Sequence, residues 1–265
     1  MSNNILSNIT LADLAALANL KPFDEDLFVE NLYADINKAI KNIEKTADKY
    51  YSDDEDKITN LLVLFLKGVG YNASEQTKSN GSVDITVQDR GQSFTWLAEA
   101  KRGNSYNGVF EGMLQLVTRY ITDEKYAGFF IYHQKLDSSG YFKNWFSYLS
   151  SGDYEKYNAI STRLEECRFH FKKNPITKAF TGNECFFDYD IVSKKGKPVK
   201  VRNFILSLHY NPADKSGRDN KSLKVGQAKL YVNEVCDKWL HEQETPKDLE
   251  KFMNCLNTAF PDLFV

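Results

Sequence analysis

Residues 81–120 read GSVDITVQDRGQSFTWLAEAKRGNSYNGVFEGMLQLVTRY and combine two strand patterns with one helical pattern in a continuous stretch. Apolar residues at positions 83, 85 and 87 alternate with polar ones, which is the period of a half-buried strand. Turn residues follow at 89–92, and residues 94–101 return as a second, paired strand. Apolar residues then recur at helical spacing over 109–121. The stretch therefore predicts a β-hairpin followed directly by a helix.

Four polar side chains in this stretch are candidates for chemistry. Asp84 lies on the first strand, Glu99 and Lys101 lie two residues apart on the second, and Gln115 lies on the helix. Since successive side chains of a strand point to opposite faces, Glu99 and Lys101 share a face, and the hairpin can bring Asp84 alongside them. A carboxylate within the apolar alternation is costly to bury without a partner, which favours a functional role for Asp84. The alternatives are a surface ion pair for Glu99 and Lys101 and a solvated helix position for Gln115.

Two carboxylates and a lysine that converge from adjacent strands can hold a divalent metal beside a water molecule. Cleavage of a phosphodiester bond requires a water in line with the leaving oxygen and a cation that neutralises the developing charge. Mg²⁺ prefers oxygen ligands and keeps several of its own waters. We therefore expect Asp84 and Glu99 to bind Mg²⁺, and Lys101 to orient the attacking water and contact the scissile phosphate.

The segments around the hairpin predict the layers of the fold. Helical spacing precedes the hairpin at residues 5–20, 24–50 and 57–67, and residues 71–77 can form a short strand. Residues 126–132, YAGFFIY, have the aromatic and β-branched content of a buried strand. A strand, a crossover helix and another strand imply an α/β fold with a mixed central sheet and helices on both faces.

The pattern Gly81-x-x-Asp84, then Glu99-Ala100-Lys101, with a helix before it and a helix bearing Gln115 after it, resembles the PD-(D/E)xK nuclease superfamily. The resemblance covers roughly residues 52–133 and implies a restriction-endonuclease-like fold. It also implies that the backbone carbonyl of Ala100 joins Asp84 and Glu99 as a Mg²⁺ ligand, and that Mn²⁺ can substitute.

Other parts of the family pattern are less regular in this chain. The helix before the site often carries another acidic residue in this superfamily, and Glu55 or Asp56 is the candidate, with Glu55 as a further metal ligand and helix capping as the alternative. Gln115 is placed as in the branch with a Gln-containing motif, where the glutamine supports the lysine or the DNA backbone. The Gln-x-x-x-Tyr form of that motif would put tyrosine at position 119. Here Arg119 stands at that position, and Tyr120 is expected on a different side of the helix.

The formal net charge of −2 requires any nucleic-acid binding to come from a local patch rather than from overall charge. The candidates for contacts with a phosphate backbone are Lys78, Arg102, Arg119, Lys195 and Lys197. The last two lie in a basic hairpin tip at 193–198, between strand patterns at 184–192 and 199–209. Solvated surface charge is the alternative for Lys78, Arg102 and the hairpin tip.

The patterns beyond residue 136 are weaker. We predict an aromatic amphipathic segment at 140–149, a helix at 154–166, a strand at 167–171 and a helix at 223–241. A last helix, capped by Thr245-Pro246, is expected to run through Leu256. The chain thus divides into an N-terminal helical segment (1–51), a nuclease core (52–135) and an α+β C-terminal extension (136–265) packed on the core.

The cysteine pattern and the hydropathy indicate in which cellular compartment the protein is expected. The four cysteines have no Cys-x-x-Cys spacing, which argues against a zinc site and is typical of reduced thiols in a cytosolic protein. The first residues lack the pattern of a signal peptide, and no stretch approaches the roughly 18 apolar residues of a membrane span. We expect a cytoplasmic protein without a membrane partner.

These observations predict a Mg²⁺-dependent DNA endonuclease, and the resemblance suggests a restriction or anti-phage defence system. The expected ligand is double-stranded DNA. A homodimer is expected because cutting both strands needs two sites. A protein of the same defence system is the other expected partner. One alternative is a non-catalytic nucleic-acid-binding or assembly subunit that keeps the fold. Another is a nuclease subunit that is silent until a partner or small ligand activates it.

Overall fold

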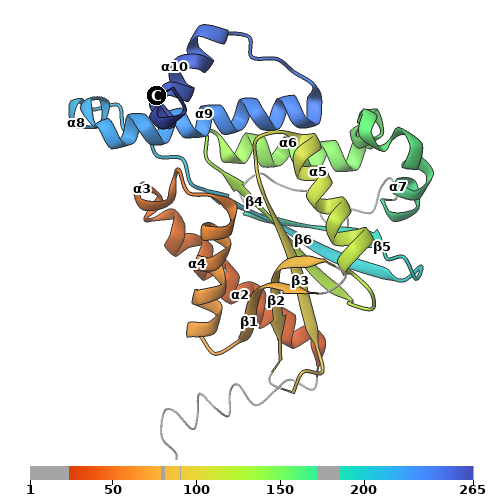
Figure 1. Cartoon of the computed structure of the whole chain (residues 1–265). Helices are drawn as coiled ribbons and strands as arrows, with labels where there is room; N and C mark the ends of the chain where they lie inside the picture. The colour runs from red at the N-terminus through yellow and green to blue at the C-terminus, as the bar shows by residue number, and fades with distance from the viewer. Residues whose placement is uncertain (1–23, 79–80, 90, 172–184, 265) are drawn as a thin grey trace, which may run out of the picture.

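The fold is built on one mixed β-sheet (Figure 1). The computed structural model describes residues 24–78, 81–89, 91–171 and 185–264. Within these residues the sheet has six strands in the order β1-β2-β3-β4-β6-β5. Their bounds are β1 Asn72–Lys78, β2 Ser82–Gln88, β3 Thr95–Arg102, β4 Tyr126–His133, β5 Phe186–Val192 and β6 Pro198–Ser207. The helix predicted at 5–20 lies outside the described residues.

The strand directions divide the sheet into a parallel centre and two antiparallel edges. β3, β4 and β6 run parallel to one another, whereas β1 and β2 at one edge and β5 at the other pair antiparallel with their neighbours. The predicted mixed sheet is confirmed, and so are the hairpin of β2 and β3 and the hairpin of β5 and β6. Because β5 and β6 lie within residues 136–265, this part of the chain also contributes to the central sheet.

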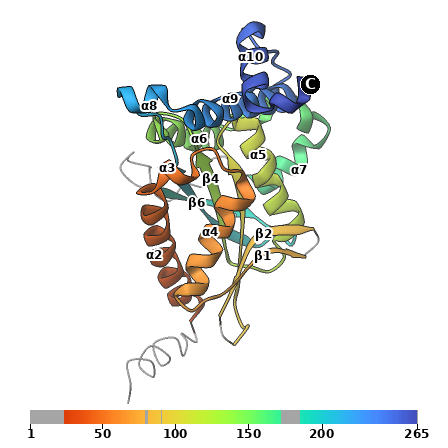
Figure 2. The ribbon, with the colours of Figure 1, turned by 60° about the vertical axis from the view of Figure 1, so that its left-hand side comes forward.

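Helices cover both faces of the sheet, as the two views in Figures 1 and 2 show. One face packs against α2 (Glu25–Glu44) and α4 (Glu55–Gly68). The other face packs against α5 (Tyr106–Gln115), α6 (Ser138–Ser151) and α7 (Leu164–His170). The shorter helical segments are α3 Ala47–Tyr50, the π-helix η2 Leu116–Tyr120, the 3₁₀ segments η3 Asp153–Lys156, η4 Asn158–Arg163 and η5 Pro261–Phe264, and α8 Lys215–Asp219.

The two faces of β3 separate apolar packing from chemistry. Trp96, Ala98 and Ala100 belong to the core under α2 and α4. Leu97 belongs to the core on the opposite face, together with residues of α5. Strand alternation places Glu99 and Lys101 on the Leu97 face, so the prediction that they share a face is confirmed.

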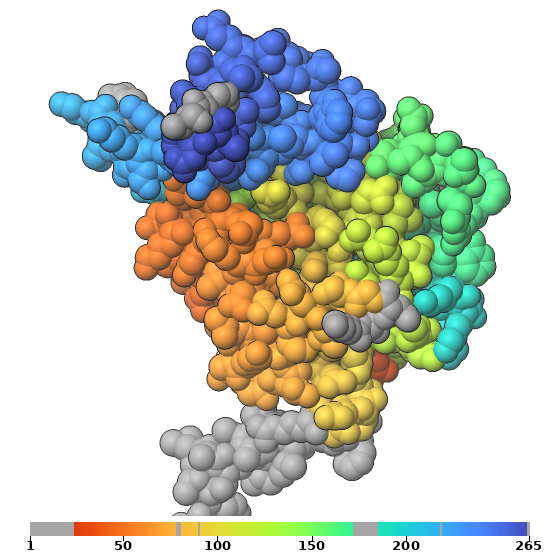
Figure 3. All heavy atoms as spheres, in the orientation of Figure 1, coloured from red at the N-terminus to blue at the C-terminus, as the bar shows by residue number. Residues whose placement is uncertain are grey.

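The last two long helices, α9 (Lys221–Glu242) and α10 (Leu249–Ala259), lie across the end of the sheet where β3 and β4 finish (Figures 1 and 2). Side-chain contacts attach α9 to the loops after both strands. Asn104, which follows β3, donates a hydrogen bond to Asp237 of α9. Lys135, which follows β4, forms an ion pair with Glu234 at 2.8 Å. Figure 3 shows α9 and α10 as a blue layer directly above the orange residues of α3 and α4.

Three predictions about the second half of the chain are wrong. Residues 167–171 form no strand, because Cys167 and His170 are the buried face of α7. Residues 154–166 form mainly 3₁₀ segments instead of one continuous helix. The last helix begins at Leu249, since Asp248 caps it by accepting a hydrogen bond from the Lys251 amide at 2.8 Å. An aspartate accepts such bonds more readily than a threonine, so the cap moves past Thr245-Pro246.

No helix in the described part of the chain is both long and apolar enough to cross a membrane.

Candidate active site

The β2–β3 hairpin opens at the point where its carboxylates lie. The ladder between the two strands ends at the Ile85↔Ala98 pair, one residue before Asp84 would face Glu99. Beyond this pair, the Asp84 side chain takes the place of a backbone partner on β2. Its Oδ2 accepts a hydrogen bond of 2.8 Å from the Ala100 amide. The carbonyl of Ala100 leaves the strand from the same edge as its amide and therefore faces the same opening.

Glu99 is the most enclosed carboxylate of the group. It is 2% exposed, and its Oε1 accepts a hydrogen bond of 2.8 Å from Lys101 Nζ. Its Oε2 is buried, and no N–H or O–H group of the described residues donates to it. Burial raises the pKa of Glu99 to about 8; the nearby Asp84 adds to this effect and Lys101 opposes it. Such a carboxyl lacks one partner that would stabilise its charged form.

Lys101 lies at the centre of the carboxylates. Its Nζ is 2.8 Å from Glu99 Oε1 and 3.2 Å from Glu55 Oε1. Burial by itself lowers the pKa of Lys101, but the charges of Glu55, Glu99 and Asp84 outweigh burial and raise it. The ammonium form is therefore the stable form at neutral pH.

A glycine of α5 makes room for this lysine. A Cβ at Gly112 would lie 2.4 Å from Lys101 Cγ and 2.8 Å from its Cε. The aliphatic stem of Lys101 therefore lies directly on the backbone of α5. Gln115 is one turn further along α5, so it lies on the side of the helix that faces the lysine, and it is half-buried.

The structure distinguishes the two acidic candidates on α4. Glu55 Oε1 pairs with Lys101, and its Oε2 accepts a hydrogen bond of 3.0 Å from the Arg102 amide. Asp54 is the capping residue of α4, since it accepts from the Lys57 amide at 3.0 Å. Asp56 lines a separate surface depression. Burial raises the pKa of Glu55, and Lys101 partly offsets the effect.

Asp84 completes a set of three acidic side chains around one lysine. Burial raises the pKa of Asp84, while Lys101, the Ala100 amide and a hydrogen bond with Glu99 act in the opposite direction. Among the described residues, no group of three or more His, Cys, Asp or Glu side chains has the arrangement to hold a metal ion by itself. The groups that could still contribute to a cation site are Asp84, Glu99 Oε2 and the Ala100 carbonyl, with water filling the remaining positions.

The position of Tyr120 differs from the prediction. The helix that follows β3 changes from α to π at Leu116, and the Ile121 amide donates to the Leu116 carbonyl five residues earlier at 3.0 Å. A π turn contains an extra residue, so Tyr120 returns toward the side of Gln115 instead of lying on a different side. Its ring would be 2.9 Å from a Cβ at Gly81, a residue with φ of 140°. Burial raises the pKa of Tyr120, and the charges of Glu99 and Asp84 add to the effect.

The five basic candidates are distributed unevenly. Arg102 is half-buried and lines a cavity beside Lys101, whereas Arg119 is exposed at the end of the π-helix. Lys195 and Lys197 form exposed ion pairs with Asp123, the second at 3.1 Å. Exposed pairs of this kind are weak, so these lysines can exchange Asp123 for another anion. Lys78 ends β1, and its side chain lies outside the described residues.

The sequence pattern did not predict that Asp237 and His241 lie near the site. A cavity of about 100 Å³ is lined by Glu55, Lys101, Arg102, Ser105 and Gly108 and, from α9, by Asp237 and His241. The helix pattern at 223–241 predicted α9 itself. Nothing in a single sequence relates positions 237 and 241 to a hairpin that lies over 130 residues earlier.

Comparisons of this chain with protein-family models, with curated proteins and with solved structures gave no significant match. The resemblance to the PD-(D/E)xK superfamily stays a prediction based on the residues quoted above.

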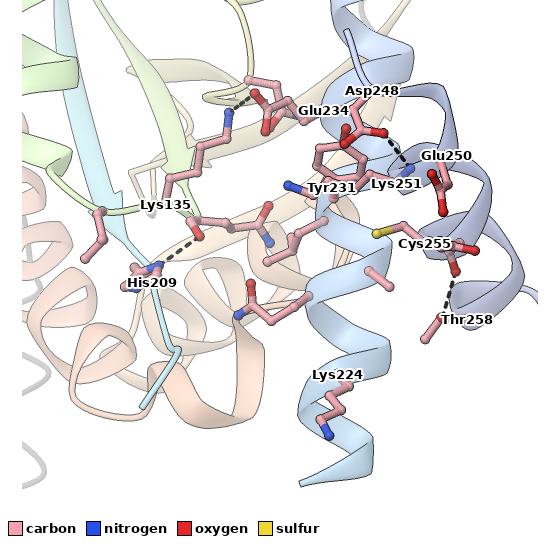
Figure 4. A pocket seen from close by; sticks show the side chains of 17 residues that line it. Lys135, His209, Lys224, Tyr231, Glu234, Asp248, Glu250, Lys251, Cys255 and Thr258 are labelled. Carbon is pink, nitrogen blue, oxygen red and sulfur yellow. Dashed lines mark hydrogen bonds and ion pairs between the residues drawn. The ribbon is translucent and has the colours of Figure 1, made fainter. Parts of the chain in front are cut away.

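A larger cavity lies further along α9 (Figure 4). It has a volume of about 890 Å³ and is lined by α9, by α10 and by residues that follow β3, β4 and β6. Lys135 and Glu234 point toward one another at one side, and Lys251 Nζ lies 4.5 Å from the centre of the Tyr231 ring. None of the three acidic residues around Lys101 lines this cavity, so it is separate from the candidate active site.

Proposed function

We propose that this protein is a metal-dependent nuclease that hydrolyses phosphodiester bonds in DNA. One observation supports the proposal above the others. Glu55, Asp84 and Glu99, which come from three separate elements, surround Lys101 where β2 and β3 part. The cost of burying three carboxyl groups together is high unless the site binds a cation or a charged substrate.

The residues present fit a divalent cation. Glu99 Oε2 is buried without a partner, and the acidic groups outnumber the single lysine. Asp84, Glu99 and the Ala100 carbonyl are the oxygen groups that would hold Mg²⁺, or Mn²⁺ in its place. When bound, such an ion offsets the negative charge that develops on the phosphate and makes its coordinated water more acidic.

Lys101 has the role of contacting the scissile phosphate and orienting the attacking water. Its ammonium is held by Glu55 and Glu99, and its stem is fixed on Gly112. A charged donor held by its surroundings needs little reorganisation when negative charge develops next to it. Glu55 then has the role of keeping Lys101 charged and in place.

The order of elements around the site supports a restriction-endonuclease-like fold. α4, the strands β1, β2 and β3, α5 and β4 follow one another in the order that the resemblance implies. We infer the biological setting, a restriction or anti-phage defence system that acts on double-stranded DNA, from the resemblance alone. A homodimer would provide the two sites that are needed to cut both strands.

The test is a cleavage assay with plasmid, linear and single-stranded DNA and with RNA, each in Mg²⁺, Mn²⁺ or chelator. We expect metal-dependent cleavage of DNA by the wild type. Lys101→Ala and Glu99→Ala should each lower the rate by about a hundredfold or more, because each removes a group that acts on the reacting phosphate. Lys143→Ala, which removes an exposed lysine on α6, is the matched control and should leave the rate unchanged.

Cleavage that survives both site substitutions would contradict the proposal. Metal-dependent DNA binding without cleavage, also in the presence of proteins encoded nearby, would favour the non-catalytic binding subunit. Cleavage that begins only when a partner or small ligand is added would favour the silent nuclease subunit.

A further inference from the structure

Helix α9 forms part of the wall of the candidate active site. The cavity of about 100 Å³ beside Lys101 is lined on one side by Glu55 and Arg102 and on the other by Asp237 and His241. α5 begins at the same cavity, with Ser105 as its capping residue. A group that contacts Lys101 from this side must therefore also meet α9.

One hydrogen-bond partner and the close approach of Gly108 orient the imidazole of His241. Its Nδ1 is 3.5 Å from the hydroxyl of Tyr157. Its Nε2 would be 3.3 Å from a Cβ at Gly108, in the first turn of α5. The ring is therefore fixed with Nδ1 toward Tyr157 and with Nε2 toward the first turn of α5, beside the cavity.

The position of α9 itself is fixed by its polar face. Glu234, Asp237 and His241 are spaced by three and four residues, so they lie along one side of the helix. Glu234 pairs with Lys135 at 2.8 Å, and Asp237 accepts a hydrogen bond from Asn104. These contacts hold His241 at the site, and Asp237 already has a donor of its own.

The cavity brings hydrogen-bond donors to the side of the site that α9 covers. Both carboxylate oxygens of Glu55 already accept hydrogen bonds, one from Lys101 Nζ and the other from the Arg102 amide. Arg102 and the ring of His241 remain as groups that can donate to a phosphate oxygen, and Lys101 keeps one N–H beyond its two carboxylate partners. The first turn of α5 presents the positive end of a helix dipole to the same space.

We propose that α9 completes the active site and that Nε2 of His241 donates a hydrogen bond to a phosphate group of the nucleic-acid strand beside Lys101. The proposal rests on the proposed nuclease function, since it names a further residue of that site. Its rival is a purely structural role in which His241 only packs α9 against α5.

Two readouts test the proposal, and one of them needs no cleavage. The chain has four histidines, so the imidazole signals of protein labelled with ¹³C-histidine can be assigned by comparison with His241→Asn. The wild type is titrated with a 12-base-pair DNA duplex in chelator, and the His241 signal should shift. His241→Asn should weaken DNA binding by about tenfold and lower kcat/KM for cleavage by a similar factor, because one charge-assisted contact is lost.

His209→Asn is the matched control. His209 lines the larger cavity and its Nδ1 lies 3.4 Å from the Gln134 carbonyl, so the same substitution there should change neither binding nor cleavage. If His241→Asn does not fold, His241→Gln replaces it, and the signal is assigned from substitutions of the other three histidines.

The outcomes separate this inference from the nuclease proposal. The role of His241 would be overturned if His241→Asn kept its DNA affinity and cleavage and if the His241 signal of the wild type did not move. The nuclease proposal would still stand in that case, provided that Lys101→Ala loses cleavage. If the His241 signal shifts but the protein never cleaves DNA, the contact with DNA is supported and the nuclease proposal is contradicted. Lower stability of His241→Asn with normal DNA affinity would establish the structural rival.

Discussion

Glu99→Gln should remove a pH-dependent loss of stability from the metal-free protein. In the folded state burial raises the pKa of Glu99 from its ordinary value of 4.5 to about 8. Below pH 4.5 the carboxyl is protonated in both the folded and the unfolded state. Between pH 4.5 and about 8 the folded state keeps the proton and the unfolded state loses it. The stability that the protonated form contributes is therefore complete below pH 4.5 and is lost as the pH rises through about 8.

The size of this loss follows from the pKa difference. At about 1.4 kcal/mol per pH unit, the change from 4.5 to about 8 corresponds to an upper limit of roughly 5 kcal/mol in the free energy of unfolding. Glutamine resembles the protonated carboxyl: its amide oxygen can still accept from Lys101, and its NH₂ group takes the place of the carboxyl proton. Glu99→Gln should match the wild type at low pH and be more stable above pH 8.

The assay is urea unfolding at a series of pH values from 4.5 to 9, followed by circular dichroism. Glu30→Gln, which changes an exposed carboxylate on α2, is the control and should follow the wild type at every pH. Adding Mg²⁺ at pH 8 should stabilise the wild type but not Glu99→Gln, since only the wild type keeps the full ligand set. A constant difference between Glu99→Gln and the wild type across this pH range would refute the reasoning.

Two further predictions concern packing. Gly112→Val should displace Lys101, whose Cγ would be 2.4 Å from the new Cβ, and should lower cleavage by about tenfold or more at a stability cost of about 1–3 kcal/mol. Gly68→Ala, where a Cβ meets nothing within 4 Å, is its control, and equal activity of the two variants in a cleavage assay would contradict the argument. Arg202→Ala should cost about 3 kcal/mol in urea unfolding, because it leaves Asp188 without a guanidinium that donates at 2.6 and 2.7 Å and lies between two aromatic rings. A loss below about 1 kcal/mol would show that the pair contributes as little as a surface ion pair.

The sequence alone was sufficient for the parts of the site that lie on one hairpin. Period-two alternation predicts that Glu99 and Lys101 share a face, and a short turn brings β2 beside β3. Both rules depend only on the geometry of neighbouring residues. The hydrogen bond between Lys101 and Glu99 confirms the first, and the register of the sheet confirms the second. The mixed sheet with helices on both faces also follows, because the order of strands and helices restricts how their apolar sides can be buried.

Contacts between distant segments, and departures from regular helix geometry, required the tertiary structure. The choice of Glu55 over Asp56 depends on which residue of α4 faces the end of β3. Tyr120 is reoriented by a π turn that helical spacing cannot reveal. His241 reaches the site because α9 lies across the ends of β3 and β4. Local periodicity records which side of an element is buried, but it contains no information about which distant element covers that side. That information exists only once the whole chain has packed.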